Sequence, residues 1–512
     1  MPNASQTLAP QGHAVPTAAP ARPGPAAVVV AVAVLLVLSW RLRDFVTDDS
    51  WISVRYAENL ANGSGAVWNP GGQRAEGFSN PLLVLLEAAA DAAGWSALPA
   101  GRALGIAAAV ACVVLVYTWG RDVVGEQAAA VGALLTGASA PFALWAVGGL
   151  ETSLTAAVLT AAVLQLARPD GGRIGVAAAL LALLPWLRPE GLVVALAVVG
   201  AGEGLALLRS ATRRAAAGRV ALLAGVPVAS QAVLEVVRLG VYGHLLPNSV
   251  LYKSGTGELL TVAHKFVDHS LPVLVPAVLG ALLLRRRQAL LVVPAAVYLA
   301  GSLGTLDSAN AYSRFFMPVW PQLALVAGVA VALVATRLAT RTPVRLSAGH
   351  APLASVVLGA VVAAVALTDV PGGQADVESW SQRYLSCRVA AREDVSRWLV
   401  ANTPQDTSFS ISDAGLVPAR AGGRTAIDAF LLNDPLIQGT GPLSPSERAD
   451  IVHGRHPDLL VLASRDADTF RGAYPTDTAI HRHAGAVGFV PLHVGSGSIP
   501  CGYHLFVFGR QG

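Results

Sequence analysis

The stretch DDSWISVRYAENLANGSGAVWNPGG, residues 48–72, follows the first long apolar segment of the chain and begins with two adjacent carboxylates. The segment RAEGFSNP follows at residues 74–81. Two acidic side chains at the mouth of a membrane span are costly unless they have a function there. The position of Asp48 and Asp49 therefore indicates chemistry at a membrane surface, with an acidic group as base.

The composition indicates a polytopic membrane protein. Of the 512 residues 54% are hydrophobic and 13% are charged, and the mean hydropathy is +0.54. Soluble domains carry about 25% charged residues. The net charge of +4 comes almost wholly from arginine, because the only lysines are Lys253 and Lys265. No basic stripe is interleaved with aromatic residues, so we expect membrane lipids and no nucleic acid as partners.

Eleven apolar stretches are each long enough to span a bilayer, for which a helix needs about 20 residues with some tolerance. They lie at 26–46, 101–120, 127–147, 151–167, 174–188, 190–208, 220–240, 270–284, 289–303, 316–336 and 352–368. Residues 1–25 are rich in Pro and Ala and lack periodicity, which predicts a disordered cytoplasmic tail. The run 82–94 is shorter and carries Glu87 and Asp91, which favours a juxtamembrane helix. The predicted membrane domain thus comprises residues 26–368.

Three arginine clusters, at 209–219, 285–287 and 337–345, set the expected topology. By the positive-inside rule they mark the cytoplasmic side, and an even number of predicted spans separates each pair. Asp48 and Asp49 then face the exterior of the plasma membrane. Arg41 and Arg43, at the same end of the first span, run against this assignment.

After residue 368 the chain becomes richer in acidic residues and histidine. The pattern predicts an amphipathic helix at 377–402 and strands at 407–412, 458–462 and 503–508. We therefore expect residues 369–512 to form an extracytoplasmic α/β cap domain. A disulfide between Cys387 and Cys501 is permitted there, but the sequence does not decide whether it forms.

The acidic pair has two interpretations. It is either a helix-end or N-cap pair, although a single Asp would suffice for capping, or a general base with an orienting or metal-binding partner. In the second case desolvation and the like-charged neighbour should raise the pKa of one carboxyl. A similar choice applies to the turn Ser412–Gly415 after a predicted strand, where an N-cap is favoured over a ligand-binding turn.

Other polar residues gather in the same predicted outer loops. Four cations there would together suit the phosphate of a lipid, although each alone could be a snorkelling side chain: Arg55, Arg188, Lys253 and Arg314. Candidate residues for binding sugar hydroxyls, with loop capping as the alternative, are Glu76, Asn80, Glu151, Glu190, Tyr56 and Asn248. No phosphate-binding glycine loop, dinucleotide-binding motif or CxxC zinc pattern is present.

These segments resemble the GT-C superfamily of polyprenyl-phosphate-sugar glycosyltransferases, and in particular the actinobacterial terminal β-(1→2)-arabinofuranosyltransferases of cell-wall arabinan. The resemblance covers nearly the whole chain and is more specific for the superfamily than for the sugar. It rests on residues 48–72 with AEGFSN at 75–80, GLETSL at 149–154, WLRPEG at 186–191, YGHLLPNSVLYKSG at 242–255, SRFFMP at 313–318 and ADIVHGRHPDLLVL at 449–462.

The resemblance implies decaprenyl-phosphoryl-arabinofuranose as donor, a growing arabinan as acceptor, and direct displacement with inversion at the anomeric carbon. Asp48 or Asp49 would deprotonate the acceptor hydroxyl. The departing phosphate would be stabilised by Arg55, Arg188, Lys253 or Arg314. Some relatives use a divalent metal, but nothing in this sequence requires one.

Three alternatives stay open at this point. The chain could be a GT-C transferase for a different lipid-linked sugar or polymer. It could be a transporter of lipid-linked sugars, which predicts internal repeats and charges buried in mid-span; we detect no such repeat. It could also be a non-catalytic scaffold whose cap binds a polymer or a protein.

Overall fold

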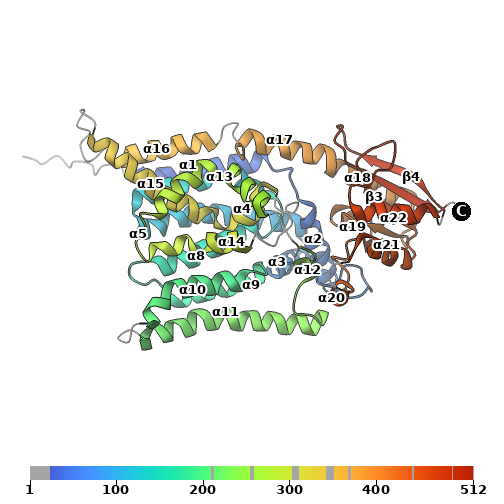
Figure 1. Ribbon diagram of the computed structural model, residues 1–512, viewed down its shortest axis with the longest axis horizontal. Helices are drawn as coiled ribbons and strands as arrows, with labels where there is room; N and C mark the ends of the chain where they lie inside the picture. Colours follow the sequence, from blue (N-terminus) through green and yellow to red (C-terminus); the bar gives the residue numbers. More distant parts are fainter. Residues whose placement is uncertain are drawn as a thin grey trace, which may run out of the picture.

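The computed structural model describes residues 23–208, 213–253, 259–301, 311–341, 351–366, 371–440, 443–486 and 488–510. Nearly all of the predicted tail lies outside these residues. The chain forms a body of long helices that run side by side, with a smaller mixed domain at one end (Figure 1). We call these two parts the helical body and the cap.

The apolar stretches fold as helices throughout the described part of the helical body. Four described helical segments are long and apolar enough to cross a membrane: Gly24–Arg41, Ala97–Val124, Arg213–Tyr242 and Ala311–Leu338. The stretch predicted as one span at 127–147 is two helices bent by 59°, which together make a fifth candidate. By this criterion the described residues hold four or five spans, and shorter apolar helices take the place of several predicted ones.

The bounds of the elements in the helical body follow the chain order. They are α1 (Pro23–Arg41), α4 (Ala97–Thr118), α5 (Gly120–Val124), α6 (Glu126–Gly137), α7 (Ala140–Val147), α8 (Thr152–Ala167), α9 (Ile174–Leu187), α10 (Gly191–Leu208), α11 (Arg213–Tyr242), α13 (Leu259–Ala281), η1 (Gln288–Leu291), α14 (Val293–Gly301), η4 (Ala311–Val319), α15 (Trp320–Arg341) and α16 (Ala351–Ala366).

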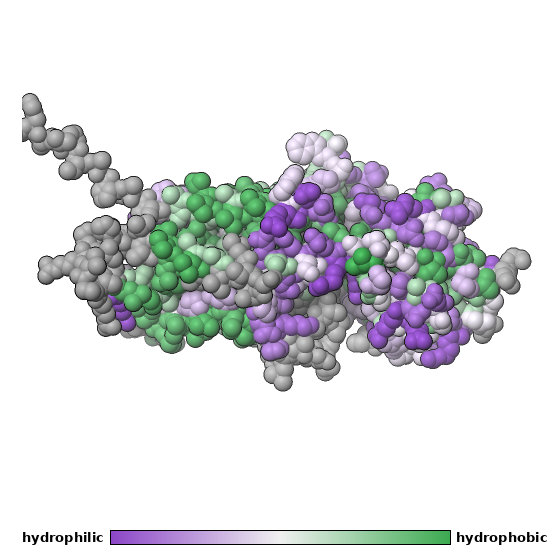
Figure 2. All heavy atoms as spheres, turned by 90° about the horizontal axis from the view of Figure 1, so that it is seen from above, coloured by the Kyte–Doolittle hydropathy of each residue, from purple (hydrophilic) through white to green (hydrophobic). Residues whose placement is uncertain are grey.

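The outer surface of the helical body is apolar. Hydrophobic side chains cover it, whereas the cap presents mostly hydrophilic ones (Figure 2). Large side chains such as Val29, Val193, Val236 and Val278 are more than half exposed. A continuous apolar surface of this kind is stable in lipid and not in water. The protein is therefore a multi-pass membrane protein.

Glycine allows the helices of the body to approach closely. A Cβ atom on Gly280 of α13 would lie 2.0 Å from the carbonyl oxygen of Val326 in α15, and one on Gly328 would lie 2.2 Å from that of Ala128 in α6. Helices in lipid associate through close packing because no hydrophobic driving force acts between them. Any larger residue at Gly280 or Gly328 would force these helices apart.

Three juxtamembrane helices lie between the helical body and the cap (Figure 1). They are α2 (Asp48–Ala61), α3 (Pro81–Ala92) and α12 (Asn248–Lys253). The helix predicted at 82–94 is confirmed as α3, which packs against α2 and α4. Asp48 and Asp49 occupy the first turn of α2, where carboxylates complement the helix dipole. The pair therefore stands at a helix end, as one interpretation predicted, but it does not supply the N-cap, because Thr47 is the N-cap residue and makes no side-chain cap hydrogen bond.

The cap is an α/β domain. Its elements are α17 (Gln374–Tyr384), the π-helical turn η6 (Leu385–Val389), α18 (Ala390–Asn402), β1 (Ser408–Ile411), α19 (Leu416–Arg420), β2 (Thr425–Asp428), α20 (Ile437–Thr440), α21 (Pro445–Gly454), β3 (Leu459–Ser464), α22 (Pro475–Ala486), β4 (Phe489–Ser496) and β5 (His504–Arg510). The strand order is β2-β1-β3-β5-β4, with β1 parallel to β2 and β3, and β5 antiparallel to β3 and β4.

The predicted strands are confirmed as β1, β3 and β5, and the helix predicted at 377–402 is interrupted only by the π-helical turn. The prediction misses β2 and β4. The first is only four residues long, and the second carries Pro491 at a register shift, so neither has a clear alternating pattern.

The sheet shares one of its two cores with α2. Leu459 and Val461 of β3 pack in a cluster with Trp51 and Val54 of α2. Leu460, on the other face of the same strand, packs with residues of α21 and α22. Burial on both faces explains the unbroken apolar run of β3. The helix that begins with the acidic pair is thus held by the cap.

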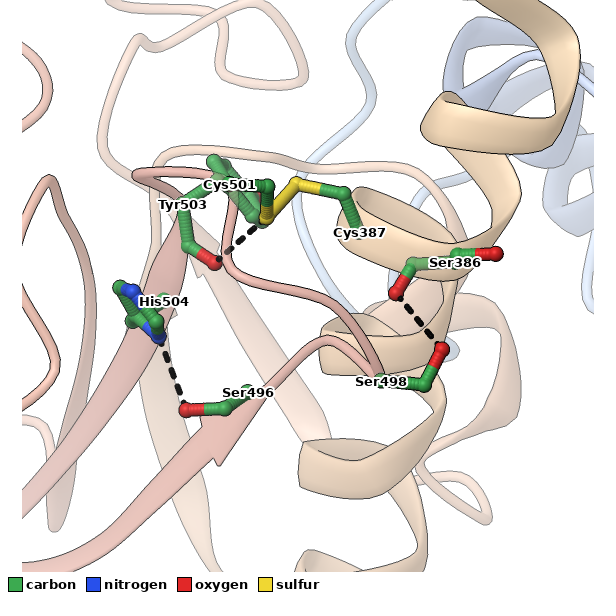
Figure 3. The surroundings of a disulfide bond; sticks show 7 residues. All are labelled: Ser386, Cys387, Ser496, Ser498, Cys501, Tyr503 and His504. Carbon is green, nitrogen blue, oxygen red and sulfur yellow. Dashed lines mark hydrogen bonds between the residues drawn. A yellow bond between two sulfur atoms is a disulfide. The ribbon is translucent and has the colours of Figure 1, made fainter. Parts of the chain in front are cut away.

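Cys387 and Cys501 form a disulfide, which the sequence leaves open. The bond ties the π-helical turn to the loop between β4 and β5 (Figure 3). Beside it the backbone N–H of Ser498 donates to the carbonyl of Ser386 over 2.7 Å. Both cysteines line the cavity described next.

Candidate active site

A cavity of about 740 Å³ lies between the helical body and the cap. Asp48 and Asp49 of α2 and Arg314 of η4 line it on one side. Arg392, Asp413 and other cap residues line it as well. The predicted acidic pair therefore faces a cavity large enough for a sugar and its neighbours.

Asp49 is the more exposed member of the pair. Its side chain is 39% exposed, and Nη1 of Arg314 lies 2.8 Å from Oδ2 of Asp49. Arg314 itself is buried and follows Tyr312 and Ser313, whose φ angles of 43° and 55° fall in the left-handed region. Such backbone costs about 1–3 kcal/mol for a non-glycine residue and is typical of functional sites. This backbone conformation directs the Arg314 guanidinium toward the Asp49 carboxylate.

Asp48 is bound to the cap. Its Oδ1 accepts a hydrogen bond from the backbone N–H of Leu416 over 3.0 Å, and Nε of Arg392 lies 3.5 Å from the same oxygen. A Cβ on Gly415 would come within 2.1 Å of the Asp48 carbonyl oxygen, so only glycine permits this approach. Burial raises the pKa of the Asp48 carboxyl, while Arg392 opposes the rise. Asp48 is thus a partly buried contact between α2 and the cap.

Arg392 of α18 lies between two carboxylates. Its Nη2 donates to Oδ2 of Asp413 over 2.8 Å, and its Nη1 donates to the Tyr384 hydroxyl over 3.1 Å. That hydroxyl in turn accepts from the backbone N–H of Asp48. Burial acts to raise the pKa of Asp413, but Arg392 and hydrogen bonds outweigh it and the pKa is lowered. Arg392 and these hydrogen bonds therefore favour the ionised form of Asp413.

The Ser412–Gly415 turn joins β1 to α19, and Gly415 is the N-cap residue of that helix, as the favoured interpretation predicted. No side chain in the turn caps the helix. Asp413 accepts hydrogen bonds from Arg392, Tyr474 and Tyr503, and it lines the cavity. A role of the turn in ligand binding stays a prediction.

A second polar network lies next to Asp49. Oγ of Ser53 donates to Asn80 over 3.0 Å, Nδ2 of Asn80 donates to Glu151 over 2.8 Å, and Arg188 pairs with both Glu151 and Glu190. A small cavity of about 20 Å³ is lined by Asp49, Ser53, Asn80 and Arg314. Ser53 and Asn80 therefore lie beside Asp49, the candidate base. The charged members of the network do not line this small cavity.

Arg188 and Arg314 flank the same aromatic ring. Their guanidinium carbons lie 5.2 and 5.6 Å from the ring centroid of Phe315. Arg188 does not line the large cavity. Because Glu151 and Glu190 both pair with its guanidinium, Arg188 has a structural role beside the candidate site.

Two predicted site residues serve to hold the backbone. Arg55 donates to the carbonyl oxygens of Trp68, Pro418 and Arg424, and it does not line the cavity. Its assignment to the donor phosphate is corrected: the side chain ties α2 to the loop after it and to the cap. The hydroxyl of Tyr56 donates to the carbonyl of Ala75 over 2.7 Å and is fully buried, so it too is structural.

Asn248 and Glu76 also lie away from the cavity. Nδ2 of Asn248 donates to the carbonyls of Leu432 and Asp434, which joins α12 to the cap. Glu76 is buried and pairs with Arg238 of α11 over 2.9 Å. Both side chains therefore hold juxtamembrane segments in place. They do not line the cavity in which a sugar could bind. The side chain of Lys253, at the end of α12, lies outside the described residues.

The Glu76 pair predicts a pH-dependent contribution to stability. Burial raises the pKa of Glu76 to about 7, although Arg238 opposes the rise, against an ordinary 4.5. The folded state therefore holds this proton more tightly, and its contribution to stability is lost as pH rises from 4.5 to 7. We expect the stability of the wild type relative to Glu76→Gln to fall by about 2–3 kcal/mol over this range, measured as thermal unfolding against pH.

Glu393→Gln, at a more exposed carboxylate in the cap, is the matched control and should leave the pH profile as in the wild type. An equal pH profile for wild type and Glu76→Gln would show that the burial of this carboxyl does not perturb its titration.

Within the described ranges, no group of three or more His, Cys, Asp or Glu side chains is arranged to hold a metal ion. The carboxylates of the cavity are instead partnered by arginines and tyrosines. We therefore derive no step through a metal.

Several cavity residues escape the sequence prediction. In the sequence, nothing distinguishes Arg392 from the other polar residues of its predicted amphipathic helix. Asp428 is the last residue of β2, a strand that the prediction misses. Asp428 is buried, which raises its pKa to about 6, and it lines the cavity. The signal that could have found it is an Asp at the C-terminal end of a short apolar run, and Asp413 likewise stands two residues after the last residue of β1.

Comparison with known proteins agrees with this architecture. A family model described as a domain of unknown function, DUF8728, matches residues 380–498, which lie in the cap. A search of the curated proteins finds no significant match. The chain is similar in structure to ArnT from Cupriavidus metallidurans bound to undecaprenyl phosphate, with 13% identity, a TM-score of 0.61, and coverage of 95% of this chain and 98% of that one.

A second similar structure is the Archaeoglobus fulgidus oligosaccharyltransferase tethered to an acceptor peptide that contains the NVT sequon. It has 14% identity and a TM-score of 0.56, with 86% of this chain and 68% of that chain covered. These likenesses show the fold. The chain is a polytopic α-helical membrane protein with a C-terminal α/β domain, and it shares its fold with these two proteins.

Proposed function

We propose that this protein is a membrane glycosyltransferase that moves a sugar from a polyprenyl phosphate to an acceptor hydroxyl. The observation that carries the proposal is the ion pair of Asp49 and Arg314 in a cavity between the helical body and the cap. A base and a phosphate-binding cation are thereby adjacent. The similar structures are transferases, and one of them is bound to undecaprenyl phosphate.

Asp49 is the base in this proposal. Its carboxylate is the more exposed of the pair, while Asp48 is taken up by Leu416 and Arg392 of the cap. Asp49 accepts the proton of the acceptor hydroxyl as its oxygen bonds to the anomeric carbon. The bond from that carbon to the phosphate oxygen breaks, and the polyprenyl phosphate leaves. A single displacement of this kind inverts the anomeric configuration.

Arg314 holds the phosphate of the donor. Its guanidinium is buried beside Asp49 and can bind two phosphate oxygens at once. The negative charge on the leaving phosphate grows during the reaction, so a fixed cation stabilises the transition state more than the ground state. Binding of the donor would also draw Arg314 away from Asp49 and free that carboxylate to accept a proton.

The cavity faces the extracytoplasmic side in this proposal. Arg219, Arg286 and Arg287 line a common pocket. Arg219 is near the N-terminal end of α11, which lies at the end of the helical body opposite the cap (Figure 1), and Arg286 and Arg287, before η1, share its pocket. By the positive-inside rule that end is cytoplasmic. The cap with its disulfide is then outside the plasma membrane, where a disulfide persists.

The donor sugar is arabinofuranose, carried by decaprenyl phosphate, and the acceptor is a cell-wall arabinan. This part of the proposal rests on the resemblance of residues 48–81 and the five later segments to terminal arabinofuranosyltransferases. A different lipid-linked sugar in the same site would keep the reaction and change only the substrate.

The test is transfer by the purified full-length protein from a synthetic prenyl-phospho-arabinofuranose to a short arabinan. We expect a product one pentose heavier than the acceptor by mass spectrometry, with the new linkage inverted relative to the donor by NMR. Transfer from another prenyl-linked sugar, but not from arabinofuranose, would contradict the substrate. Absence of transfer with every prenyl-linked sugar, together with movement of such lipids across vesicles, would favour a transporter.

A further inference from the structure

Three aromatic rings line the cap side of the cavity and come from three separate elements. They are Tyr252 of α12, Phe430 after β2 and Tyr474 before α22. The ring centroids of Tyr252 and Phe430 are 5.4 Å apart, and those of Phe430 and Tyr474 are 5.3 Å apart. Each residue is only partly buried. We call these three rings the aromatic shelf.

The turn that carries Phe430 is rigid. The carboxylate of Asp428 accepts hydrogen bonds from the backbone N–H of Phe430 and from the backbone and side chain of Asn433. Leu431, between them, has a φ of 61°. This strained turn is fixed by a buried carboxylate, which presents the Phe430 ring to the cavity at little further entropic cost on binding.

Arg448 of α21 supports the shelf. Its guanidinium carbon lies 5.5 Å from the ring centroid of Tyr252 and 5.8 Å from that of Phe430, and Arg448 does not line the cavity. Contacts of this kind stabilise by about 0.5–2 kcal/mol. The cation therefore holds the two rings in place without occupying the cavity.

Charged groups lie around the rings. Asp413, which accepts from the Tyr474 hydroxyl over 3.1 Å, lines the same cavity, as do Asp428 and Arg388. A sugar ring has one face of C–H groups, which packs on aromatic rings, and hydroxyls at its rim, which hydrogen-bond to carboxylates and guanidinium groups. A polyprenyl chain offers nothing to these charges and would have to leave the bilayer to reach the cap.

We infer that the aromatic shelf is the acceptor subsite and that it binds a chain of neutral sugar rings. The inference rests on the proposed function in taking Asp49, in the same cavity, as the base that receives the acceptor's proton. The terminal ring then reaches Asp49, while earlier rings of the acceptor pack on the shelf. This assigns a role to Tyr252, Phe430 and Tyr474 that catalysis alone does not require.

The test measures binding of a synthetic arabinofuranosyl tetrasaccharide to the full-length protein in detergent, without donor, by saturation-transfer NMR titration. We expect Phe430→Ala and Tyr252→Ala each to weaken binding about tenfold, since each removes one ring contact. Tyr252→Phe keeps the ring and should bind within about twofold of the wild type. Trp398→Ala, at a cap ring stacked on His493 and outside the cavity, is the matched control.

The binding assay tests the acceptor subsite, and the transfer assay tests the proposed function, so the two can fail independently. In the transfer assay the alanine variants should raise the acceptor KM more than they lower kcat. Tetrasaccharide binding that depends on the aromatic shelf, without sugar transfer by the wild type, would contradict the proposed function and support the subsite. No tetrasaccharide binding by the wild type, or equal binding by folded Phe430→Ala and Tyr252→Ala, would overturn the subsite. If Phe430→Ala does not fold, Tyr252→Ala with Tyr252→Phe decides.

Discussion

Asp49→Asn is expected to lower kcat for sugar transfer by about a thousandfold, because a positioned general base contributes about 10²–10⁴-fold and asparagine cannot accept the proton. The amide keeps the size of the side chain and can still meet Arg314, so the fold should survive. The measurement is single-turnover transfer from the prenyl-phospho-arabinofuranose donor, with thermal unfolding of the same sample as a check of folding.

Asp44→Asn is the matched control for this variant. Asp44 lies just before the same helix, its side chain is 69% exposed, and it does not line the cavity. Its variant should transfer at the wild-type rate. Asp48→Asn should act mainly on stability, because Asp48 is held by Leu416 and Arg392. Loss of transfer in folded Asp48→Asn, with near-normal transfer in Asp49→Asn, would reverse the assignment of the base.

Arg392→Met is expected to destabilise the protein by about 3–5 kcal/mol, the usual cost of leaving a buried charge without its partner. Arg392 is 3% exposed and lies between the carboxylates of Asp48 and Asp413. Without it two acids would share a buried site with no cation between them. The measurement is the thermal unfolding midpoint of the full-length protein in detergent.

Arg397→Met is the control, on the same helix and with a side chain 70% exposed. Surface ion pairs contribute at most about 1 kcal/mol, so this variant should stay near the wild type. In Arg392→Met with Asp413→Asn one of the two unpaired acids becomes neutral, and part of the loss should return. A loss as small as that of Arg397→Met would contradict a central role for Arg392.

Much of the fold could be predicted because it depends on local composition. Long apolar stretches must become helices in lipid, where every backbone group needs an internal partner. The helix at 377–402 and three of the strands follow from periodicity in the same way. The number of spans was less predictable, since the helix expected at 127–147 bends at Ser139, whose side chain caps the second half, with Pro141 in the first turn of that half.

The candidate site was predictable only in part. Asp48, Asp49 and Arg314 meet in one cavity as expected. Arg55 lies away from that cavity for a physical reason: its buried guanidinium donates to backbone carbonyl oxygens, which need such a partner as much as a phosphate would. The sequence offers no sign of which demand it meets.

By itself the sequence determined that this chain crosses a membrane, ends in an α/β domain, and carries an acidic pair between the two. Those properties follow from composition and from periodicities of a few residues. Only the tertiary structure decided that Asp48 is held by the cap, whereas Asp49, which lines the same cavity, pairs with Arg314. The partners of Asp48, Leu416 and Arg392, lie more than 300 residues along the chain, and their approach depends on packing of α2 against the sheet.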